Sequence, residues 1–196
     1  MAEAEKGTSC EYIVVLAPAS DRYEGRALKA GALAALVVFA AVYMVNLYGF
    51  DTGSDPGWLL LEGVGAGALV TLLAMKWARL RRLLIPRWRM HAAVQNAANA
   101  VFTEENVTLT KDRNAVLLYV SVLEGEALLM PDIGVTRKVP EAKLGEIHSK
   151  LTHATGSANQ LVCDAIKALG ECCKDCFPRA TDDDNELPDR PQIRMP

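Results

Sequence analysis

Two long apolar segments constrain this chain more than any other feature of its sequence. Between residues 30 and 47 the only strongly polar side chain is Asn46, and between residues 58 and 75 the only charged one is Glu62. A helix of about 18 residues rises roughly 27 Å, which is close to the hydrocarbon thickness of a bilayer. A short acidic connection joins the two segments. The sequence therefore predicts a transmembrane helical hairpin over residues 27–76.

The basic residues around these segments predict the orientation of the hairpin. Lys and Arg near the ends of membrane spans favour the cytoplasmic side. The connection at residues 49–57 contains Asp51 and Asp55 but neither Lys nor Arg. The flanking segments, in contrast, are basic, with Arg22, Arg26, Lys29, Lys76, Arg79, Arg81, Arg82, Arg87 and Arg89. We therefore expect a multi-pass protein of the cell inner (cytoplasmic) membrane with both termini in the cytoplasm.

Targeting and cysteine chemistry agree with that orientation. The first apolar segment begins only at residue 30, after a stretch of mixed charge, and no small-residue cleavage site is evident before the second segment. Both features disfavour a signal peptide. The five cysteines would then lie in a reducing compartment, where structural disulfides are rare.

Small residues predict how the two spans pack together. Gly63 and Gly67 form a GxxxG pattern in the second span, which allows close helix contact in lipid. The first span offers equally small surfaces at Ala32, Ala35 and Ala40. We expect these residues to pack within the hairpin. The alternative is that the glycine face docks on another membrane subunit.

A basic and aromatic stretch follows the second span. Trp77 and Trp88 are the expected interfacial anchors, and Pro86 between them should kink or restart the helix. The arginines of this stretch would face anionic lipid headgroups. They are Arg79, Arg81, Arg82, Arg87 and Arg89.

The remaining pattern predicts an α/β domain around the hairpin. Residues 12–17 and 115–123 are apolar on both faces, as covered strands are, and residues 91–105 have the spacing of an amphipathic helix. Strand, helix and strand make a βαβ unit with parallel strands, so the hairpin is an insertion after the first strand. A turn at residues 124–126 and a strand at 127–130 complete a β-hairpin, with Asp132 as a turn residue. Two helices follow, at residues 140–154 and 159–177.

The sequence therefore predicts a chain of four parts. Residues 1–26 supply the N-terminal strand segment, and residues 27–76 the membrane hairpin. Residues 77–178 form the cytoplasmic α/β domain, and residues 179–196 an acidic, proline-rich tail.

This order of elements resembles the TPM domain family. The resemblance rests on residues 114–119, on the turn and strand at 124–130 and on Ile133-Gly134-Val135. Residues 183–189 are also similar to the tails of bacterial membrane-anchored members. The resemblance implies a small three-layer α/β/α sheet domain and association with, or maintenance of, membrane protein complexes. The chain lacks the helical segment that precedes the first strand in better-known members, and it does not match the acidic positions linked there to calcium or phosphatase work.

Two groups of residues could carry chemistry, and each has a structural interpretation beside it. Cys173 and Cys176 form a CxxC pattern with Cys172 next to it, but they continue an apolar helical stripe. Core packing is therefore our interpretation, with a redox pair or a metal site as alternatives. The candidate metal ligands of the tail are Asp182, Asp183, Asp184 and Glu186. They lack the spacing of a calcium-binding loop. The structural interpretation is a tail that is solvated or that docks on the basic residues 79–89.

Two functions from different classes fit this sequence. The net charge of −3 gives no argument for nucleic-acid binding, and we find no Ser/His/Asp set, P-loop or zinc motif that would predict catalytic residues or a cofactor. The first function is a non-enzymatic, membrane-anchored accessory or assembly subunit. Its cytoplasmic domain would dock on a larger integral membrane complex, such as a respiratory or photosynthetic one. The second is a membrane-tethered, metal-assisted phosphatase that uses the acidic tail.

Overall fold

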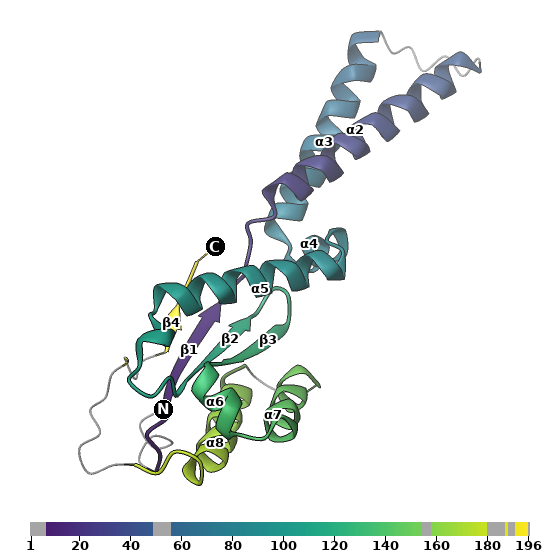
Figure 1. The fold of residues 1–196 in the computed structure, drawn as a ribbon. Helices are drawn as coiled ribbons and strands as arrows, with labels where there is room; N and C mark the ends of the chain where they lie inside the picture. The colour runs from purple at the N-terminus through teal and green to yellow at the C-terminus, as the bar shows by residue number, and fades with distance from the viewer. Residues whose placement is uncertain (1–6, 49–55, 154–157, 180–186, 188–190, 196) are drawn as a thin grey trace. The chain divides into compact units, whose positions relative to one another are not determined.

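The computed structural model describes residues 7–48, 56–153, 158–179, 187 and 191–195 (Figure 1). The chain divides into two compact units. The first, which we call the sheet unit, consists of residues 1–21 and 90–196. The second, the hairpin unit, consists of residues 22–89. The hairpin unit is thus inserted into the sequence of the sheet unit.

A four-stranded mixed sheet organises the sheet unit. Its strands are β1 (Glu11–Ala17), β2 (Ala115–Ser121), β3 (Glu126–Pro131) and β4 (Gln192–Ile193), in the order β3-β2-β1-β4. β1 and β2 are parallel along their whole length, from Glu11 opposite Ala115 to Ala17 opposite Ser121. β3 is antiparallel to β2, and β4 is parallel to β1. The predicted parallel pair and the predicted β-hairpin are both confirmed, whereas β4 lies in the tail, where no strand was predicted.

Both faces of the sheet are buried, because alternate residues of the parallel strands enter two different apolar clusters. Ile13 and Val15 of β1 pack with Leu117 and Tyr119 of β2 on one face. Tyr12 and Val14 pack with Val116 and Leu118 on the other. All of these side chains are at most 2% exposed. The apolar residues of β1 and β2 therefore have buried partners on both faces, and Leu16 and Val120 are the partly buried ones among them.

Helix α5 (Arg87–Glu104) covers the first face. It begins directly after Pro86, which fits the predicted restart, and it starts four residues before the predicted helix at 91–105. Val94, Ala98 and Val101 recur at helical spacing and carry the contact with the sheet. The helix ends near Asn106, which adopts a left-handed conformation with φ 54°.

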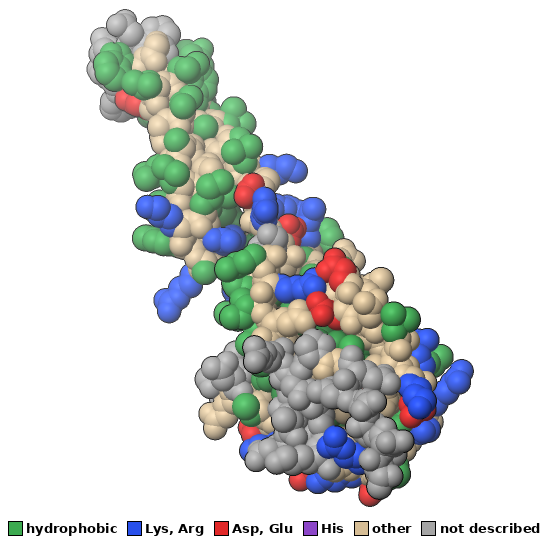
Figure 2. All heavy atoms as spheres, turned by 90° about the vertical axis from the view of Figure 1, so that its left-hand side faces the viewer, with side chains coloured by type: hydrophobic (Ala, Val, Ile, Leu, Met, Phe, Trp, Pro, Cys, Tyr) green, Lys and Arg blue, Asp and Glu red, His purple; other side chains and the backbone are tan. Residues whose placement is uncertain are grey.

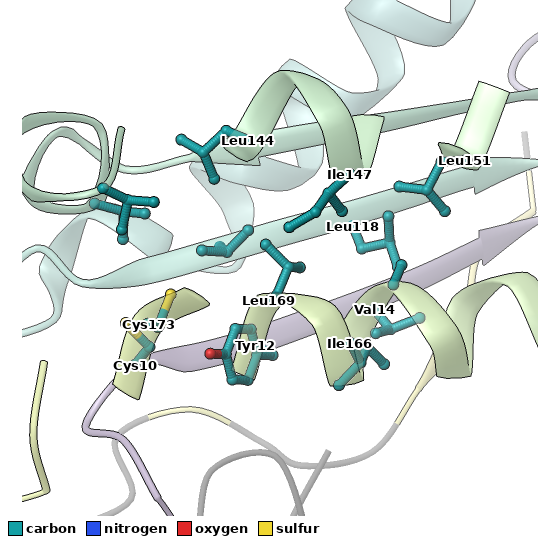
Figure 3. Packing of buried hydrophobic residues seen from close by; sticks show 14 of the residues in the cluster. Cys10, Tyr12, Val14, Leu118, Leu144, Ile147, Leu151, Ile166, Leu169 and Cys173 are labelled. Carbon is teal, nitrogen blue, oxygen red and sulfur yellow. The ribbon is translucent and has the colours of Figure 1, made fainter. Parts of the chain in front are cut away.

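Helices α7 (Glu141–His153) and α8 (Ala158–Lys174) cover the second face. Leu144, Ile147 and Leu151 of α7 and Ile166 and Leu169 of α8 enter the same cluster as Tyr12 and Val14 of β1 (Figure 3). Both helices occupy the predicted positions, and residue 154 lies outside the described residues. α8 is shorter than predicted, because the amides of Cys176 and Phe177 both turn back to the carbonyl of Cys173.

The hairpin unit holds helices α2 (Glu24–Leu47), α3 (Pro56–Lys76) and α4 (Ala78–Leu84). Among the described residues, α2 and α3 are the two helices long and apolar enough to cross a membrane, with a mean hydropathy of 2.1 and 1.8 over their most apolar 18 residues. Trp77 separates α3 from α4 in an extended conformation, φ −101° and ψ 106°. α4 in turn ends before Ile85, which is also extended and precedes Pro86, as the steric demand of proline requires.

We expect the sheet to be sensitive to cavities at its centre. Leu117→Ala removes a fully buried side chain of β2 that packs beneath α5, and it should lower the free energy of unfolding by about 2–5 kcal/mol. Urea unfolding of the full chain in detergent, followed by circular dichroism, measures the change. Leu109→Ala is the matched control, since Leu109 is 75% exposed, and it should change the stability by less than about 0.5 kcal/mol.

Candidate functional site

The two apolar helices meet through backbone contacts that only very small residues allow. A Cβ atom added to Gly67 would lie 2.7 Å from the carbonyl oxygen of Gly31 and 2.8 Å from the Cβ of Ala35. A Cβ on Gly63 would lie 3.0 Å from the carbonyl oxygen of Ala35. The structure therefore places the GxxxG residues against the first apolar helix.

The partner surface differs in part from the predicted one. Ala35 makes the contact, but Ala32 and Ala40 are exposed. Gly31 takes their place, and a Cβ there would lie 1.9 Å from the hydroxyl oxygen of Thr71. That hydroxyl donates a hydrogen bond of 2.9 Å to the carbonyl oxygen of Gly67 in its own helix, so it adds no polar group to the surface.

The surface that this contact leaves outside is strongly apolar. Large side chains on both helices are more than half exposed, and Figure 2 shows hydrophobic side chains along the hairpin unit on the face in view. They include Leu33, Leu36, Val37, Leu60, Leu61, Leu69 and Leu72. Water-soluble monomers rarely expose such a continuous apolar surface, which is typical of a surface that interacts with a membrane or with another protein. Glu62 lies on the exposed part of α3.

The basic and aromatic stretch remains largely solvent-exposed. Trp77 is 61% exposed and Trp88 68%, and Leu83 of α4 is 82% exposed. Four of its arginines are exposed as well: Arg79, Arg82, Arg87 and Arg89. This combination of aromatic rings, an exposed leucine and cationic groups is typical of a segment at a membrane interface.

Arg81 has a different role from the other arginines of this stretch. Its guanidinium donates a hydrogen bond of 2.7 Å to the carbonyl oxygen of Met75 in the last turn of α3. Cationic donors are favourable at this end of a helix, where carbonyl groups lack intrahelical partners. Arg81 therefore fixes the break between α3 and α4, a role that the sequence did not indicate.

In the sheet unit, one polar corner joins the start of β2 to the end of β3. Arg113 donates hydrogen bonds of 2.7 and 2.9 Å to the two carboxylate oxygens of Asp132, which is 3% exposed. The same carboxylate accepts a hydrogen bond of 2.7 Å from the amide of Ile133. Asp132 is therefore the N-cap of helix α6 (Ile133–Lys138) rather than a turn residue.

Close backbone approach completes this corner. The amide of Gly134 donates to the carbonyl oxygen of Arg113 at 3.0 Å, and a Cβ on Gly134 would lie 2.5 Å from that same oxygen. Arg113 itself has a φ of 53°, in the left-handed region. Glycine at position 134 is thus required by the approach of two chain segments, and the corner is a structural joint.

A second polar cluster lies at the carboxyl ends of β1 and β2, where α/β sheets often place ligands. Ser20 donates to the Ser121 hydroxyl at 2.8 Å, and Ser121 donates to the Glu124 carboxylate. Tyr119 lies 3.2 Å from the Ser20 hydroxyl, and it is the donor because the Ser20 proton is already used. The amide of Ser20 also donates to Glu124, at 3.0 Å.

This chain of hydroxyl groups ends on a buried carboxylate, but its members bind one another. Tyr119, Ser121 and Glu124 are each at most 3% exposed. Burial, together with the Glu124 charge, raises the pKa of Tyr119, so the phenol stays protonated and acts as a donor. The cluster therefore fastens the segment after β1 to the turn after β2. The sequence did not indicate this cluster, because Ser20 and Ser121 are 101 residues apart and residues 124–126 were predicted only as a turn.

Four of the five cysteines lie in or beside the apolar core of the sheet unit, and the fifth, Cys163, is exposed. Cys10 and Cys173 are at most 1% exposed and belong to the cluster between the sheet and α8 (Figure 3). Cys172 and Cys176 pack partly buried against it, and all five thiols are free. The hydrogen bond with Cys173 and burial raise the pKa of Cys10, so its thiol stays protonated in the core. The location agrees with core packing.

The candidate metal ligands of the tail lie outside the described residues. These are Asp182, Asp183, Asp184 and Glu186. Among the residues that the structure describes, no group of three or more His, Cys, Asp or Glu side chains is placed to hold a metal ion.

Comparison with known proteins adds information on the fold. No family model and no curated protein matches the chain. Among solved structures, the chain is similar to the BA42 protein from the psychrophilic bacterium Bizionia argentinensis, determined by NMR. The TM-score is 0.55 at 19% sequence identity, and the match covers 98% of this chain and 86% of that one. At this identity the similarity shows the fold alone.

The glycine contact predicts a selective effect of bulky substitutions. Gly67→Ile should separate α2 from α3 and lower the stability of the hairpin unit by about 1–3 kcal/mol, the usual cost of overpacking. Gly65→Ile is the matched control, because nothing lies within 4 Å of its Cβ position. Unfolding in mixed micelles by titration with sodium dodecyl sulfate compares the two variants. Equal effects would show that the contact does not hold the helices together.

The Asp132 corner predicts a pH dependence of stability. Burial alone would raise the pKa of the carboxyl group, but the hydrogen bonds from Arg113 and from the Ile133 amide outweigh it and lower the pKa. Stability from this group is therefore present above the ordinary aspartate pKa, about 3.9, and is lost as the pH falls through the lower folded-state value.

We expect Asp132→Asn to reduce the urea midpoint at pH 7 and the difference from the unsubstituted protein to narrow below about pH 4. Urea unfolding at pH 7, 5 and 3 measures this difference. Asp112→Asn is the control, because Asp112 precedes Arg113 in the sequence and its side chain is exposed. This variant should give the same urea midpoint as the unsubstituted protein at each pH. A difference that stays constant down to pH 3 would contradict the role of the ionised carboxylate.

Proposed function

We propose that this chain is a non-enzymatic membrane-anchored accessory subunit, in which α2 and α3 form a transmembrane hairpin and the sheet unit docks on a larger membrane protein complex. The exposed apolar surface of α2 and α3 carries the proposal. Both helices have the length for a span, and their polar backbone groups are satisfied within each helix, as a bilayer requires. The anchor would belong to a multi-pass protein of the cytoplasmic membrane with both termini in the cytoplasm.

The basic and aromatic stretch supports this orientation. The exposed arginines of residues 79–89 would meet anionic headgroups at the cytoplasmic surface, with Trp77 and Trp88 at the level of the interface. Glu62 lies one turn after Trp58, which is 59% exposed, so it would reach the opposite interface. These positions place charge at the two ends of the proposed spans.

The polar clusters of the sheet unit support a docking role rather than catalysis. The buried carboxylates of Asp132 and Glu124 are both occupied by hydrogen bonds that join neighbouring segments. A catalytic carboxylate needs access to a substrate, which neither of these has. We further propose that the sheet unit is a three-layer α/β/α domain of the TPM type, since helices pack on both sheet faces and Gly134 is held by the corner that its motif forms.

The native cysteine Cys163 can report the orientation, because it is exposed on α8. The test uses a background in which the half-buried Cys172 and Cys176 are replaced by serine. A membrane-impermeant maleimide should label this protein in spheroplasts only after permeabilisation. A second reporter, Ser54→Cys in a Cys163→Ser background, should label intact spheroplasts. Labelling of Cys163 in intact spheroplasts would show that the orientation is the opposite of the proposed one. Release of the protein by alkaline carbonate would show that the chain is not anchored in the membrane.

The accessory role is tested in native membranes. A photo-crosslinking amino acid at the exposed Leu72 or Cys163 should give adducts with a distinct membrane protein, and gentle solubilisation should keep the chain in a particle larger than itself. The buried Leu59 is the control position, where no intermolecular adduct is expected. Recovery as a free monomer without adducts would contradict the accessory role.

A further inference from the structure

The C-terminal segment is held on the outer edge of β1 by a small number of contacts. Gln192 and Ile193 pair with Val15 and Leu16 in parallel, and the amide of Arg194 donates to the carbonyl oxygen of Leu16 at 3.1 Å. Figure 1 shows this segment, β4, beside β1. β1 pairs with β2 over seven residues, so within the described residues its inner edge is used far more fully than its outer one.

Side chains from the end of α5 select what lies on this edge. Arg194 forms ion pairs with both Glu104 and Glu105. Gln192 donates a hydrogen bond of 2.7 Å to Glu105. Residues two apart in a strand point to the same side, so positions 192 and 194 face the two carboxylates together. The two glutamates therefore select a polar donor followed, two residues later, by an arginine.

The apolar side chains of the same segment contribute little to its retention. Ile193 is 72% exposed and Met195 is 79% exposed. Of the described tail residues, Leu187 is the one that packs against the cluster beneath α5. The ion pairs of Arg194 are partly exposed, which limits their contribution to stability, and a strand of two residues adds few backbone hydrogen bonds. The segment is thus recognised specifically by charge and backbone but held weakly.

We propose that the outer edge of β1, together with Glu104 and Glu105, is a docking site for an extended segment of a partner protein that carries a donor-x-arginine sequence. The chain's own residues 192–194 occupy this site in cis until the partner segment displaces them. Strand addition of this kind takes affinity from backbone hydrogen bonds and specificity from alternate side chains. Tethering raises the effective concentration of the tail, so only a partner that binds more tightly or is itself held nearby exchanges with it.

This inference names a docking surface for the accessory role proposed above and rests on that role for its biological use. The charge pattern favours a basic peptide, since an acidic segment would place like charges beside Glu104 and Glu105. Position 193 is tolerant, because its side chain faces solvent in the tail itself. Binding should weaken as the salt concentration rises, since the selecting charges are partly exposed.

The test uses the full chain in detergent and a fluorescent peptide of residues 187–195. Arg194→Glu in the protein places a carboxylate beside Glu104 and Glu105 and should release the tail. Fluorescence anisotropy should then show saturable binding of the peptide that is at least ten-fold tighter for this variant than for the unsubstituted protein, whose own tail competes. Circular dichroism of the variant should retain the cooperative unfolding of the unsubstituted chain.

Matched peptides separate recognition from nonspecific attraction. The peptide with Arg194→Glu should bind at least ten-fold more weakly, whereas the peptide with Ile193→Ala should bind with unchanged affinity. Each of three results would overturn the proposal. They are a lack of peptide binding to the Arg194→Glu protein, equal binding of the peptide to both proteins, and loss of cooperative unfolding in the variant. These readouts use isolated protein, so they can fail while the membrane anchor and its crosslinks stand, and the reverse also holds.

Discussion

The parallel pairing of β1 with β2 is the interaction on which the rest of the structure depends. Each strand supplies residues to both apolar clusters, so the pairing fixes the position of α5 on one face and of α7 and α8 on the other. The hydroxyl cluster at the carboxyl ends of the strands and the Asp132 corner at the opposite end close the pair. Because β1 precedes the hairpin unit in the sequence and β2 follows it, this pairing also closes a chain segment of 97 residues, from 18 to 114. A long loop adds only slowly to the entropic cost of closure, so such an insertion is compatible with a stable sheet.

The hairpin unit solves a different physical problem with a different kind of contact. In a bilayer, the environment that we propose for this unit, no hydrophobic driving force would bring two apolar helices together, so close packing and hydrogen bonds would have to do so. Gly31, Gly63 and Gly67 permit backbone contact, and Thr71 satisfies its hydroxyl within its own helix. The side chains on the outside of the two helices can then be large and apolar without affecting the contact between them. Specificity within the hairpin and affinity for its surroundings are therefore carried by separate residues.

The sequence predicted those features that depend on local pattern. The two strands with apolar residues on both faces identified β1 and β2, and their apolar character implied that they pair inside a covered sheet. Helical periodicity located α5, α7 and α8 to within a few residues. The GxxxG pattern marked the glycine face of α3, but not Gly31, because a single glycine in an apolar helix has no distinctive spacing.

The features that could not be predicted depend on contacts distant in sequence. Asp132 follows a strand and lies two residues before Gly134, which is typical of a turn, and only its hydrogen bonds with Arg113 and Ile133 show why it starts a helix. Arg81 belongs to a basic run whose members look alike until one of them reaches Met75. β4 has two residues in a proline-rich tail, too few for a pattern, and its place is set by Glu104 and Glu105 some ninety positions earlier.

The carboxylates of the sheet unit show how its chemistry is distributed. Glu124 and Asp132 are buried and fully engaged in joining segments that meet at opposite ends of the parallel strands. Glu104 and Glu105, in contrast, are more exposed and hold a segment that contributes little apolar burial. Removing the carboxylate of Glu124 or of Asp132 leaves a hydrogen-bond donor unsatisfied in the interior. Exchanging the segment that is bound to Glu104 and Glu105 removes no such buried carboxylate. Buried acidic groups thus maintain the fold, while the proposed exchange of partners takes place at the more exposed glutamates at the end of α5. The docking role that we propose needs this separation, because the recognition surface would have to open while the core stays closed.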